Sequence, residues 1–271
     1  MLGGYAGLVS LGHSAFFGTG ALVTRVLWIS GVPIVIALLI GGIASITASL
    51  IIGVPSLRLK GAYFSMGTLA LTIILYIITS SIFIDQSFLP QDYIASYSIL
   101  PRYFLGVAIV IASLLAVYWF THSRRGIGII AIRENEDVAR TLGINVFEGK
   151  VVALAISAFF AGISGGFFAY HQVSYYYYYP FSALWSFEPI LVTFIGGIGT
   201  AIGPVIGALF YVIVREVFVV TLGKAHIIVF SLLFILVVLL LPGGLVEAWD
   251  KLGKTLRKGG TRSESQGAPL A

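Results

Sequence analysis

The sequence predicts an all-α fold, a polytopic transmembrane helical bundle of about eight spans. Of its 271 residues, 58% are hydrophobic and only 10% are charged. The mean hydropathy is +1.01, and a soluble domain of this length could not bury so much apolar surface. The apolar stretches do not alternate with polar residues, which favours helical spans of about 20 residues over the strands of a membrane barrel.

Apolar stretches follow one another along most of the chain. They cover, in order, residues 5–29, 33–54, 62–84, 103–121, 150–171, 184–220 and 226–243. The stretch at 184–220 is long enough for two crossings, and we expect it to break at Gly196–Gly199, which gives about eight spans in total. Because the first of these two spans is short, a re-entrant segment buried by neighbouring helices is the alternative.

The basic residues are concentrated in two places. Five of the 16 Lys and Arg residues lie between Arg124 and Lys150, and five more lie between Lys251 and Arg262. Cytoplasmic loops carry an excess of such residues, so we expect both places in the cytoplasm and the acidic loop around Asp85 outside. Topology therefore explains the net charge of +5 better than nucleic-acid binding does.

The chain divides into a membrane domain and a tail. We expect residues 1–246 to form one permease-like bundle, with a cytoplasmic loop at 122–149. Residues 247–271 are rich in Gly, Ser and basic residues, and we expect a disordered cytoplasmic tail there.

The charged loop contains a short amphipathic helix. Residues 128–143 read G-I-I-A-I-R-E-N-E-D-V-A-R-T-L-G. At helical spacing one side carries Ala131, Asn135, Val138 and Leu142. Glu136 precedes Arg140 by four residues in the favourable ion-pair order, and Gly143 supplies a C-terminal stop. Such a helix can dock into a groove on a soluble partner; a solvated connector is the alternative.

Three further blocks accompany this loop. They read G-G-Y-A-G-L-V-S-L-G-H-S-A-F-F-G-T-G-A-L at residues 3–22, L-R-L-K-G-A-Y-F-S-M-G-T-L-A-L at 57–71 and G-G-I-G-T-A-I-G-P-V-I-G-A at 196–208. Together the four blocks resemble the branched-chain amino-acid ABC transporter permease family, in particular its LivM-type subunit. The resemblance runs through nearly the whole chain in the family's order, although it implies further hydrophobic sequence ahead of the block at Gly4.

The resemblance implies a set of partners and a location. The partners are a second permease subunit in a heterodimer, two cytoplasmic ATPases, a periplasmic or lipid-anchored substrate-binding protein, and the lipid of a bacterial or archaeal cytoplasmic (inner) membrane. The chain has no G-x-x-x-x-G-K-[ST] loop, so we expect no cofactor here and ATP in the partner subunits. The loop helix then becomes the ATPase-coupling helix, with Arg133, Glu134, Asn135, Glu136, Ala139, Leu142 and Gly143 as its contact residues.

The glycine-rich segment at 3–20 is the expected substrate path. It contains too many helix breakers for a lipid-facing helix and should face protein or a polar path. A broken helix exposes backbone N–H groups at its positive dipole end, where a substrate carboxylate can bind. The path residues we expect are Gly4, Tyr5, Gly7, Ser10, Gly12, His13, Phe16, Tyr63 and Glu188.

Several of these residues have a structural alternative. His13 can be a buried imidazole hydrogen-bonded to a neighbouring helix, and Glu188, just before Pro189, can cap a helix or reach the interface rather than line a pathway. The run Tyr175–Tyr179 fits an interfacial aromatic belt, with docking of a binding protein as the alternative.

Two further patterns bear on packing and on metals. Gly199, Gly203 and Gly207 recur every four residues, which predicts close helix packing rather than a dinucleotide loop. We expect no metal site, because no second ligand stands at suitable spacing from His13. The chain also has no cysteine, which excludes disulfides and thiolate sites.

Other functions and substrates stay open. Within the transporter class, urea or short-amide permeases and sugar permeases share much of this pattern. A membrane-embedded enzyme using His13, Glu188 or His171 as acid and base would belong to a different class, and we do not expect an enzyme because no paired nucleophile or metal cluster accompanies them. A passive channel would need the glycine-rich segments but no docking helix.

Overall fold

The computed structural model describes residues 2–95, 97–200 and 202–223, together with residues 229, 232, 235–236 and 244–247. The chain forms two compact units, Met1–Glu188 and Pro189–Ala271, and passes from one to the other within a single helix. Most of the expected span at 226–243 and nearly all of the expected tail at 247–271 fall outside the described residues, so both stay predictions.

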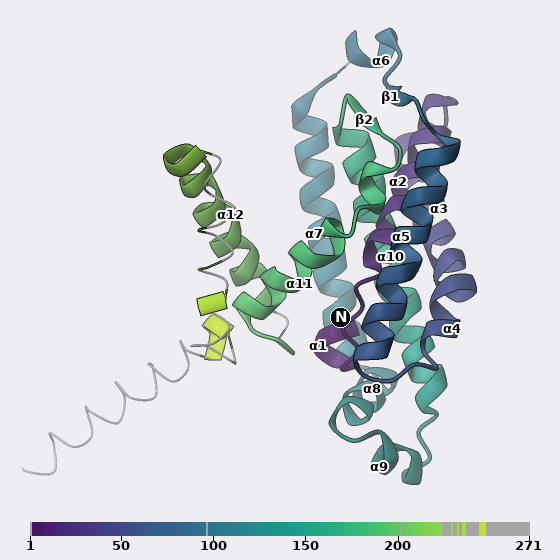
Figure 1. Ribbon diagram of the computed structural model, residues 1–271, viewed down its shortest axis with the longest axis vertical. Coiled ribbons are helices and arrows are strands. Elements are labelled where there is room, and N and C mark those ends of the chain that lie inside the picture. Colours follow the sequence, from purple (N-terminus) through teal and green to yellow (C-terminus); the bar gives the residue numbers. More distant parts are fainter. Residues whose placement is uncertain are drawn as a thin grey trace, which may run out of the picture. The chain divides into compact units, whose positions relative to one another are not determined.

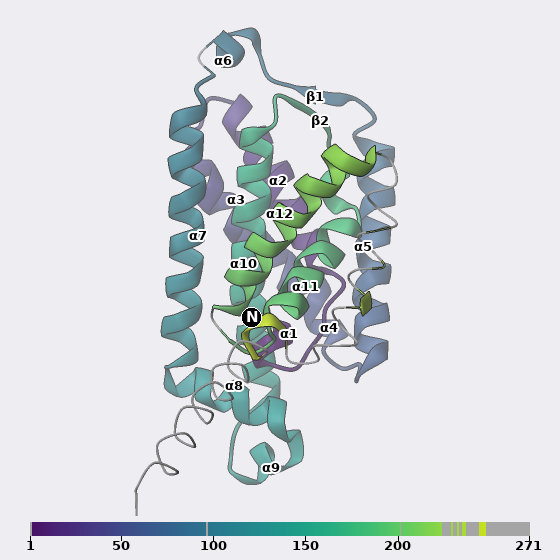
Figure 2. The same ribbon diagram turned by 90° about the vertical axis from the view of Figure 1, so that its left-hand side faces the viewer.

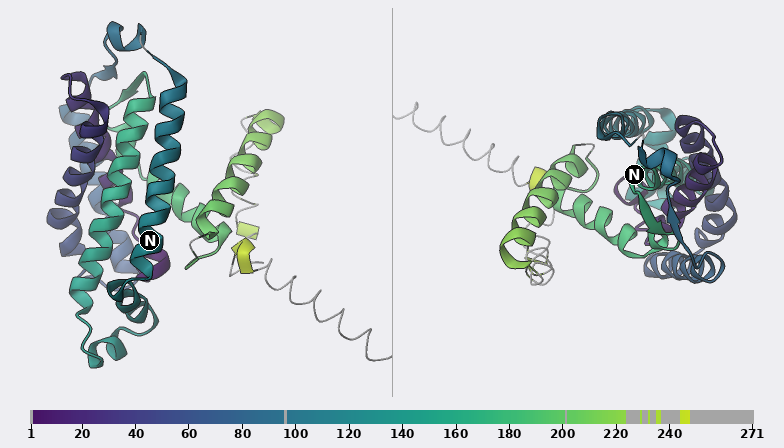
Figure 3. Two further views of the ribbon diagram at one scale, coloured as in Figure 1. Left: turned by 180° about the vertical axis from the view of Figure 1, so that it is seen from behind. Right: turned by 90° about the horizontal axis from the view of Figure 1, so that it is seen from above.

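The first unit is almost entirely helical, as predicted. In chain order its elements are α1 (Leu2–Tyr5), α2 (His13–Ile29), α3 (Ile34–Ala48), the π-helix η1 (Ser49–Gly53), α4 (Val54–Ser56), α5 (Ala62–Ile82), β1 (Gln86–Phe88), α6 (Gln91–Ala95), α7 (Ile99–Thr121), α8 (Arg124–Glu134), α9 (Glu136–Thr141), α10 (Val146–His171), β2 (Ser174–Tyr176), the 3₁₀ turn η2 (Tyr179–Phe181) and the start of α11 (Leu184–Gly196). Figure 1 places α6, β1 and β2 at one end of this unit and α8 and α9 at the other. Seen from above in Figure 3, the long helices lie end-on and side by side.

Within the described residues, five helices are long and apolar enough to cross a membrane. They are the run α3–η1–α4, α5, α7, α10 and, in the second unit, α12 (Gly203–Leu222). Large apolar side chains cover their outer surfaces; Ile43, Ile77 and Val110, for example, are more than half exposed in this chain. Such surfaces require lipid or a partner subunit around them. The predicted helical membrane bundle is therefore confirmed.

The first apolar stretch, predicted at 5–29, is a broken helix. α1 ends at Tyr5, residues 6–12 have an irregular backbone, and α2 begins at His13. α2 packs against α3, α5 and α10 in the interior of the unit. A Cβ atom on Gly20 would overlap the carbonyl group of Gly162 on α10. The glycines thus allow the α2 and α10 backbones to touch, as small residues do between membrane helices.

A small antiparallel sheet lies at the end of the unit opposite α8 and α9 (Figure 1). β1 pairs with β2 so that Ser87 faces Tyr175. The tyrosines that follow form an aromatic cluster, in which Tyr176 stacks on Tyr178 with ring centroids 5.3 Å apart. Tyr175 is buried beneath the sheet, whereas Tyr176 is 45% exposed. The tyrosine cluster therefore has one side anchored in the protein, and its place at a membrane interface stays a prediction.

The stretch at 184–220 divides into two helices, as predicted. α11 ends at Gly196 and α12 begins at Gly203, and Figure 2 shows them as separate helices. With 13 residues, α11 is about 20 Å long, which is short for a hydrocarbon core about 30 Å thick. Its length therefore fits the re-entrant alternative, and the total of about eight spans stays a prediction.

The expected row of packing glycines is partly wrong. Gly199 lies in the turn between α11 and α12 with φ of +84°, so it is not on a helix face. Its conformation favours glycine because a side chain would clash with the backbone there. Gly203 and Gly207 do lie on α12, and a Cβ atom on Gly207 would overlap the carbonyl group of Val192. Close packing thus involves Gly203 and Gly207 but not Gly199.

Candidate functional site

α2 begins inside the bundle, and hydroxyl groups surround its N-terminus. The first N–H groups of a helix have no partner within the helix. Here the Gly12 N–H donates to Ser10 Oγ at 3.2 Å and the Ser14 N–H donates to Ser186 Oγ at 2.8 Å. Ser186 belongs to α11, so a side chain from a distant part of the sequence satisfies this helix end.

Three buried hydroxyl groups meet at this point. Ser186 Oγ donates to Ser14 Oγ at 2.9 Å, and Ser14 Oγ lies 3.5 Å from Thr72 Oγ1. One turn earlier on α5, Thr68 Oγ1 accepts the Leu11 N–H at 3.2 Å. Thr72 is the eleventh of the 21 residues of α5, so the cluster lies near the mid-depth of that span. Hydroxyl groups in this position hydrogen-bond helices to one another or contact what passes through the bundle.

His13 is held by a neighbouring helix. Its Nε2 atom lies 2.7 Å from Ser157 Oγ on α10, and its ring stands edge-on to Phe16 with centroids 5.8 Å apart. This geometry matches the buried, hydrogen-bonded imidazole that was the structural alternative, while contact with substrate stays a prediction. In the described part of the chain, no group of three His, Cys, Asp or Glu side chains is arranged to hold a metal ion.

The structure gathers only part of the expected substrate path at the hydroxyl cluster. Ser10, Gly12, His13 and Phe16 lie there, with Phe16 in the apolar core beside it. Tyr63, the second residue of α5, is 75% exposed and forms no wall of the cluster in this chain.

Glu188 also belongs to the helix that reaches the cluster. It lies two residues beyond Ser186 on α11, which places it on about the opposite side of that helix. It is half-buried and is followed by Pro189 inside the helix. Proline removes one helical hydrogen bond and favours a kink, so the helix is weakened beside the residue that contacts α2.

The other expected path residues contact α8 instead. Arg133 Nη1 donates a hydrogen bond of 2.6 Å to the carbonyl oxygen of Gly4. Gly7 has φ of +68° and lies against the same side chain, since a Cβ atom on it would approach Arg133 Cγ to 3.2 Å. Tyr5 ends α1 next to this contact. These residues therefore connect the segment ahead of α2 to the charged loop.

The predicted coupling helix consists of two helices, so the single helix expected in the charged loop is wrong. Asn135 has an extended backbone (φ −157°, ψ 112°) that ends α8 after Glu134 and starts α9. Its Oδ1 atom accepts the N–H groups of Asp137 and Val138 at 3.0 and 3.1 Å. Asparagine is a preferred N-cap because its side chain can satisfy these groups. We call α8, α9 and Asn135 between them the elbow.

The ion pair within α9 and its C-terminal stop are as predicted. Glu136 accepts a hydrogen bond of 2.7 Å from Arg140, four residues later. Gly143 follows the helix with φ of +79° and donates its N–H to the Arg140 carbonyl, so it acts as the predicted C-terminal stop.

An ion pair joins α9 to the first turns of α10. Lys150 Nζ lies 2.7 Å from Glu136 Oε2, and its side chain is only 12% exposed. The hydrogen bond from Lys150 holds the pKa of Glu136 below its ordinary value, with further lowering by the charges of Lys150, Arg140 and Lys60. Glu136 therefore stays ionised and links the elbow to a membrane-spanning helix.

The apolar side of the elbow differs from the predicted one. Ala139 is buried against Ile132 and Val146, whereas Val138 and Leu142 are 53% and 72% exposed. The break at Asn135 rotates α9 relative to α8, so Ala131 and Val138 no longer share one face. The elbow thus presents Val138 and Leu142 outward beside charged side chains.

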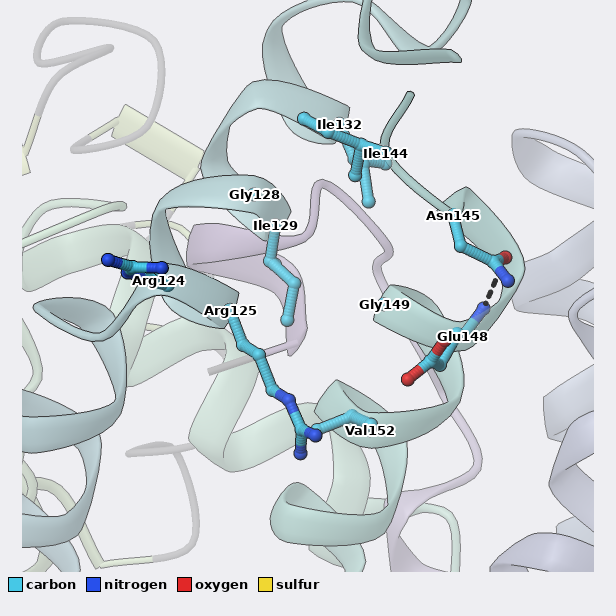
Figure 4. A pocket seen from close by; sticks show the side chains of 10 residues that line it. All are labelled: Arg124, Arg125, Gly128, Ile129, Ile132, Ile144, Asn145, Glu148, Gly149 and Val152. Atoms are coloured by element: carbon cyan, nitrogen blue, oxygen red, sulfur yellow. Dashed lines mark hydrogen bonds between the residues drawn. The ribbon is translucent and has the colours of Figure 1, made fainter. Parts of the chain in front are cut away.

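A groove of about 200 Å³ lies between α8 and the start of α10. Apolar side chains of Ile129, Ile132 and Ile144 line it, and Figure 4 shows Arg125 extending along it toward Val152. The remaining lining residues are Arg124, Gly128, Asn145, Glu148 and Gly149. Asn145 Oδ1 accepts the Glu148 N–H at 3.1 Å and caps α10. This cap holds the first turn of α10, which forms one side of the groove, in place.

Sequence reasoning missed four hydroxyl residues of the cluster. Thr68 and Thr72 lie four residues apart on one face of an apolar helix, a spacing that could have indicated them. Ser157 and Ser186 lie far from α2 in the sequence, and only the fold brings them to it.

A comparison with known proteins identifies the family of the chain. Residues 1–241 match the family model for the branched-chain amino acid transport system permease component. No curated protein and no solved structure shows significant similarity to the chain. The matched region includes the broken helix, the elbow and the α11–α12 turn, and the family is one of transport permeases rather than enzymes. The chain therefore belongs to the branched-chain amino acid transport permease family.

Proposed function

We propose that this chain is the LivM-type membrane subunit of an ABC importer that moves branched-chain amino acids across the cytoplasmic membrane of a bacterium or archaeon. Its partners are a second permease subunit, two cytoplasmic ATPases that bind ATP, and a substrate-binding protein on the outer side. The basic elbow and the basic tail lie in the cytoplasm under this proposal, in line with the charge rule for membrane proteins.

The link between the elbow and the segment ahead of α2 is the observation that supports this proposal most. Val138 and Leu142 offer an apolar contact to a groove on an ATPase, and the charged side chains around them set its register. From the elbow, Arg133 reaches the Gly4 carbonyl. Movement of the elbow therefore pulls on residues 2–12, which lead directly to the hydroxyl cluster.

The hydroxyl cluster is the proposed contact for the amino-acid headgroup. The N-terminus of α2 carries a partial positive charge that favours a carboxylate, and discontinuous helices in transporters place such ends near mid-depth. In this structure the Ser14 N–H already donates a hydrogen bond to Ser186 Oγ. A substrate carboxylate therefore has to displace Ser186 to bind this N–H group. Phe16 supplies an apolar wall for an aliphatic side chain.

Uptake competition tests the substrate. The complete complex is reconstituted in proteoliposomes and takes up labelled leucine with ATP inside. Isoleucine and valine should compete, whereas urea, short amides and ribose should not, because they lack the carboxylate that the α2 N-terminus favours. Competition by urea or ribose alone would replace this substrate class by one of the alternatives.

Charge reversal separates an ATP-driven permease from a passive channel. Glu134→Lys and Glu136→Lys together change the elbow surface, and Asp85→Lys, exposed near β1 at the opposite end of the unit, is the matched control. ATP-dependent uptake should be lost in the double variant and retained in the control. A passive channel would conduct equally in all three proteins, with or without ATP.

A further inference from the structure

A buried arginine stands near the end of α2 farthest from the elbow. Arg25 is 0% exposed, and no acidic side chain of the described residues lies within ion-pair distance of it. A guanidinium group has five N–H donors. Their acceptors are Ser87 Oγ (2.8 Å) for Nε, the Ala169 and Gln172 carbonyls (3.0 and 3.1 Å) for Nη1, and the Ser87 and Val173 carbonyls (3.4 and 2.9 Å) for Nη2. All five donors are used, so none is left for a substrate carboxylate.

These acceptors belong to a larger set at the end of α10. The five consecutive carbonyl groups at 169–173 each accept a hydrogen bond from a side chain of another segment. Arg25 bonds to three of them, Arg102 on α7 bonds to the Tyr170 carbonyl, and the Tyr97 hydroxyl bonds to the His171 carbonyl at 3.2 Å. The last carbonyl groups of a helix have no internal partner and carry its negative dipole end. Two guanidinium groups therefore fix this helix end strongly.

The same arginine holds the β1–β2 sheet. It bonds to Ser87 of β1 through both the hydroxyl and the carbonyl group. Opposite Ser87 in the sheet is Tyr175, whose ring centroid lies 5.3 Å from the Arg25 guanidinium carbon. Arg25 thus contacts both strands and links β1, through Ser87, to the carbonyl groups at the end of α10, while β2 follows α10 directly in the chain.

The other end of α10 is joined to the elbow. Lys150, in its second turn, bonds to Glu136 of α9. α10 has 26 residues without proline, so it extends over about 39 Å. One uninterrupted helix therefore contacts the elbow near its start and the sheet at its end.

We propose that α10 transmits movement of the elbow to the β1–β2 sheet, and that Arg25 is the positioning residue that keeps the sheet attached to α10. This inference rests on the proposed function, because the elbow moves only if ATPases act on it. The sheet then follows each displacement of α9, so that the two ends of the bundle change state together.

The test uses the complete complex and a single introduced thiol. The chain has no cysteine, and Leu89, just after β1, is 4% exposed and donates its N–H to the Val173 carbonyl. Leu89→Cys therefore reports detachment of the sheet through its rate of modification by a maleimide. Arg25→Gln and Arg25→Lys are compared with Arg58→Gln, which removes an exposed arginine between α4 and α5. The second readout is the number of ATP molecules hydrolysed per leucine transported.

Arg25→Gln should raise the modification rate of the introduced thiol at least about tenfold, equivalent to about 1.4 kcal/mol, and should raise the ATP consumed per leucine. Arg25→Lys should give a smaller rise, because an ammonium has three donors instead of five. Arg58→Gln should change neither value. A merely structural role would lower uptake and ATP hydrolysis in parallel and leave their ratio unchanged.

Two outcomes overturn the inference, and they differ from failure of the proposed function. If Arg25→Gln does not assemble, Ser87→Ala removes one acceptor alone. An unchanged modification rate and an unchanged ATP consumption per leucine in both Ser87→Ala and Arg25→Lys would then overturn the inference. If Arg25→Gln does assemble, an unchanged modification rate and an unchanged ATP consumption per leucine in that complex would overturn the inference directly. Absence of ATP-driven uptake in the unaltered complex would instead refute the proposed function.

Discussion

Replacing Glu136 by Gln should loosen α9 from α10 while keeping the size and shape of the side chain. Glu136 accepts hydrogen bonds from Lys150 on α10 and from Arg140 on its own helix, both at 2.7 Å. The substitution removes the negative charge and leaves at most neutral acceptors. We therefore expect α9 to open more often, with little change in the membrane-spanning part of the protein.

The size of this effect follows from the surroundings of the two contacts. The Lys150–Glu136 contact is partly buried, and a hydrogen bond between charged groups contributes about 1.5–3 kcal/mol. The Arg140–Glu136 contact is an exposed i,i+4 pair of about 0.3–0.5 kcal/mol. A neutral hydrogen bond recovers about 0.5–1.5 kcal/mol. The net loss is about 1–2 kcal/mol, or a factor of about 5–30 in the opening equilibrium.

Hydrogen exchange of the α9 amides measures this opening. The matched control is Glu134→Gln, because the Glu134 side chain is 71% exposed and its ion pair with Arg133 is 3.8 Å long. Exchange at Ala139 and Arg140 should accelerate about 5–30-fold in Glu136→Gln and hardly at all in the control. Equal exchange in both variants would refute the reasoning, since it would show that Lys150 does not hold α9.

The same contact has a pH dependence of defined sign. Lys150 lowers the pKa of Glu136 below its ordinary value of 4.5. A group whose pKa is lowered by folding stabilises the folded state above its ordinary pKa and loses this contribution as pH falls through the lowered value. After correction for intrinsic rates, α9 exchange should therefore increase below about pH 4.5 in the unaltered protein and stay flat in Glu136→Gln.

Three further variants test other contacts. Gly20→Ala puts a methyl group against the Gly162 carbonyl and should cost about 1–3 kcal/mol in thermal unfolding; an unchanged midpoint contradicts the close α2–α10 packing. Ser186→Ala frees the Ser14 N–H for substrate and should lower the KM for leucine about 2–10-fold, the worth of one neutral hydrogen bond; a higher KM contradicts the displacement. Leu142→Asp should change stability by less than about 0.5 kcal/mol but abolish ATP-dependent uptake; normal uptake contradicts apolar docking.

The fold was predictable because its main determinant is hydrophobicity. Long apolar stretches specify membrane helices whatever their neighbours, and the glycines at 196–199 indicated the break between α11 and α12. The break at Asn135 was not predicted, because the heptad-like spacing of Ala131, Val138 and Leu142 suited one continuous helix. The asparagine side chain bonds to the backbone of the following residues instead, a competition that periodicity does not reveal.

The site was less predictable because distant segments assemble it. Ser10, Gly12 and His13 were found from local breakers, but Ser186 reaches Ser14 across 172 residues. Likewise, Arg133 was expected to face an ATPase, yet its side chain contacts Gly4. No spacing rule relates residues so far apart. The proposed role of Arg25 could not be foreseen either, because four of its five hydrogen bonds go to backbone carbonyl groups, which every residue carries.

The most direct measurement of the central claim is the accessibility of the elbow. Val138→Cys introduces the single thiol of the chain at a residue that is 53% exposed, and an impermeant maleimide is applied to oriented membrane vesicles with and without the ATPase subunits. We predict modification only from the cytoplasmic side, with strong protection once the ATPases assemble. Modification from the outer side, or equal modification with and without ATPases, would contradict the account.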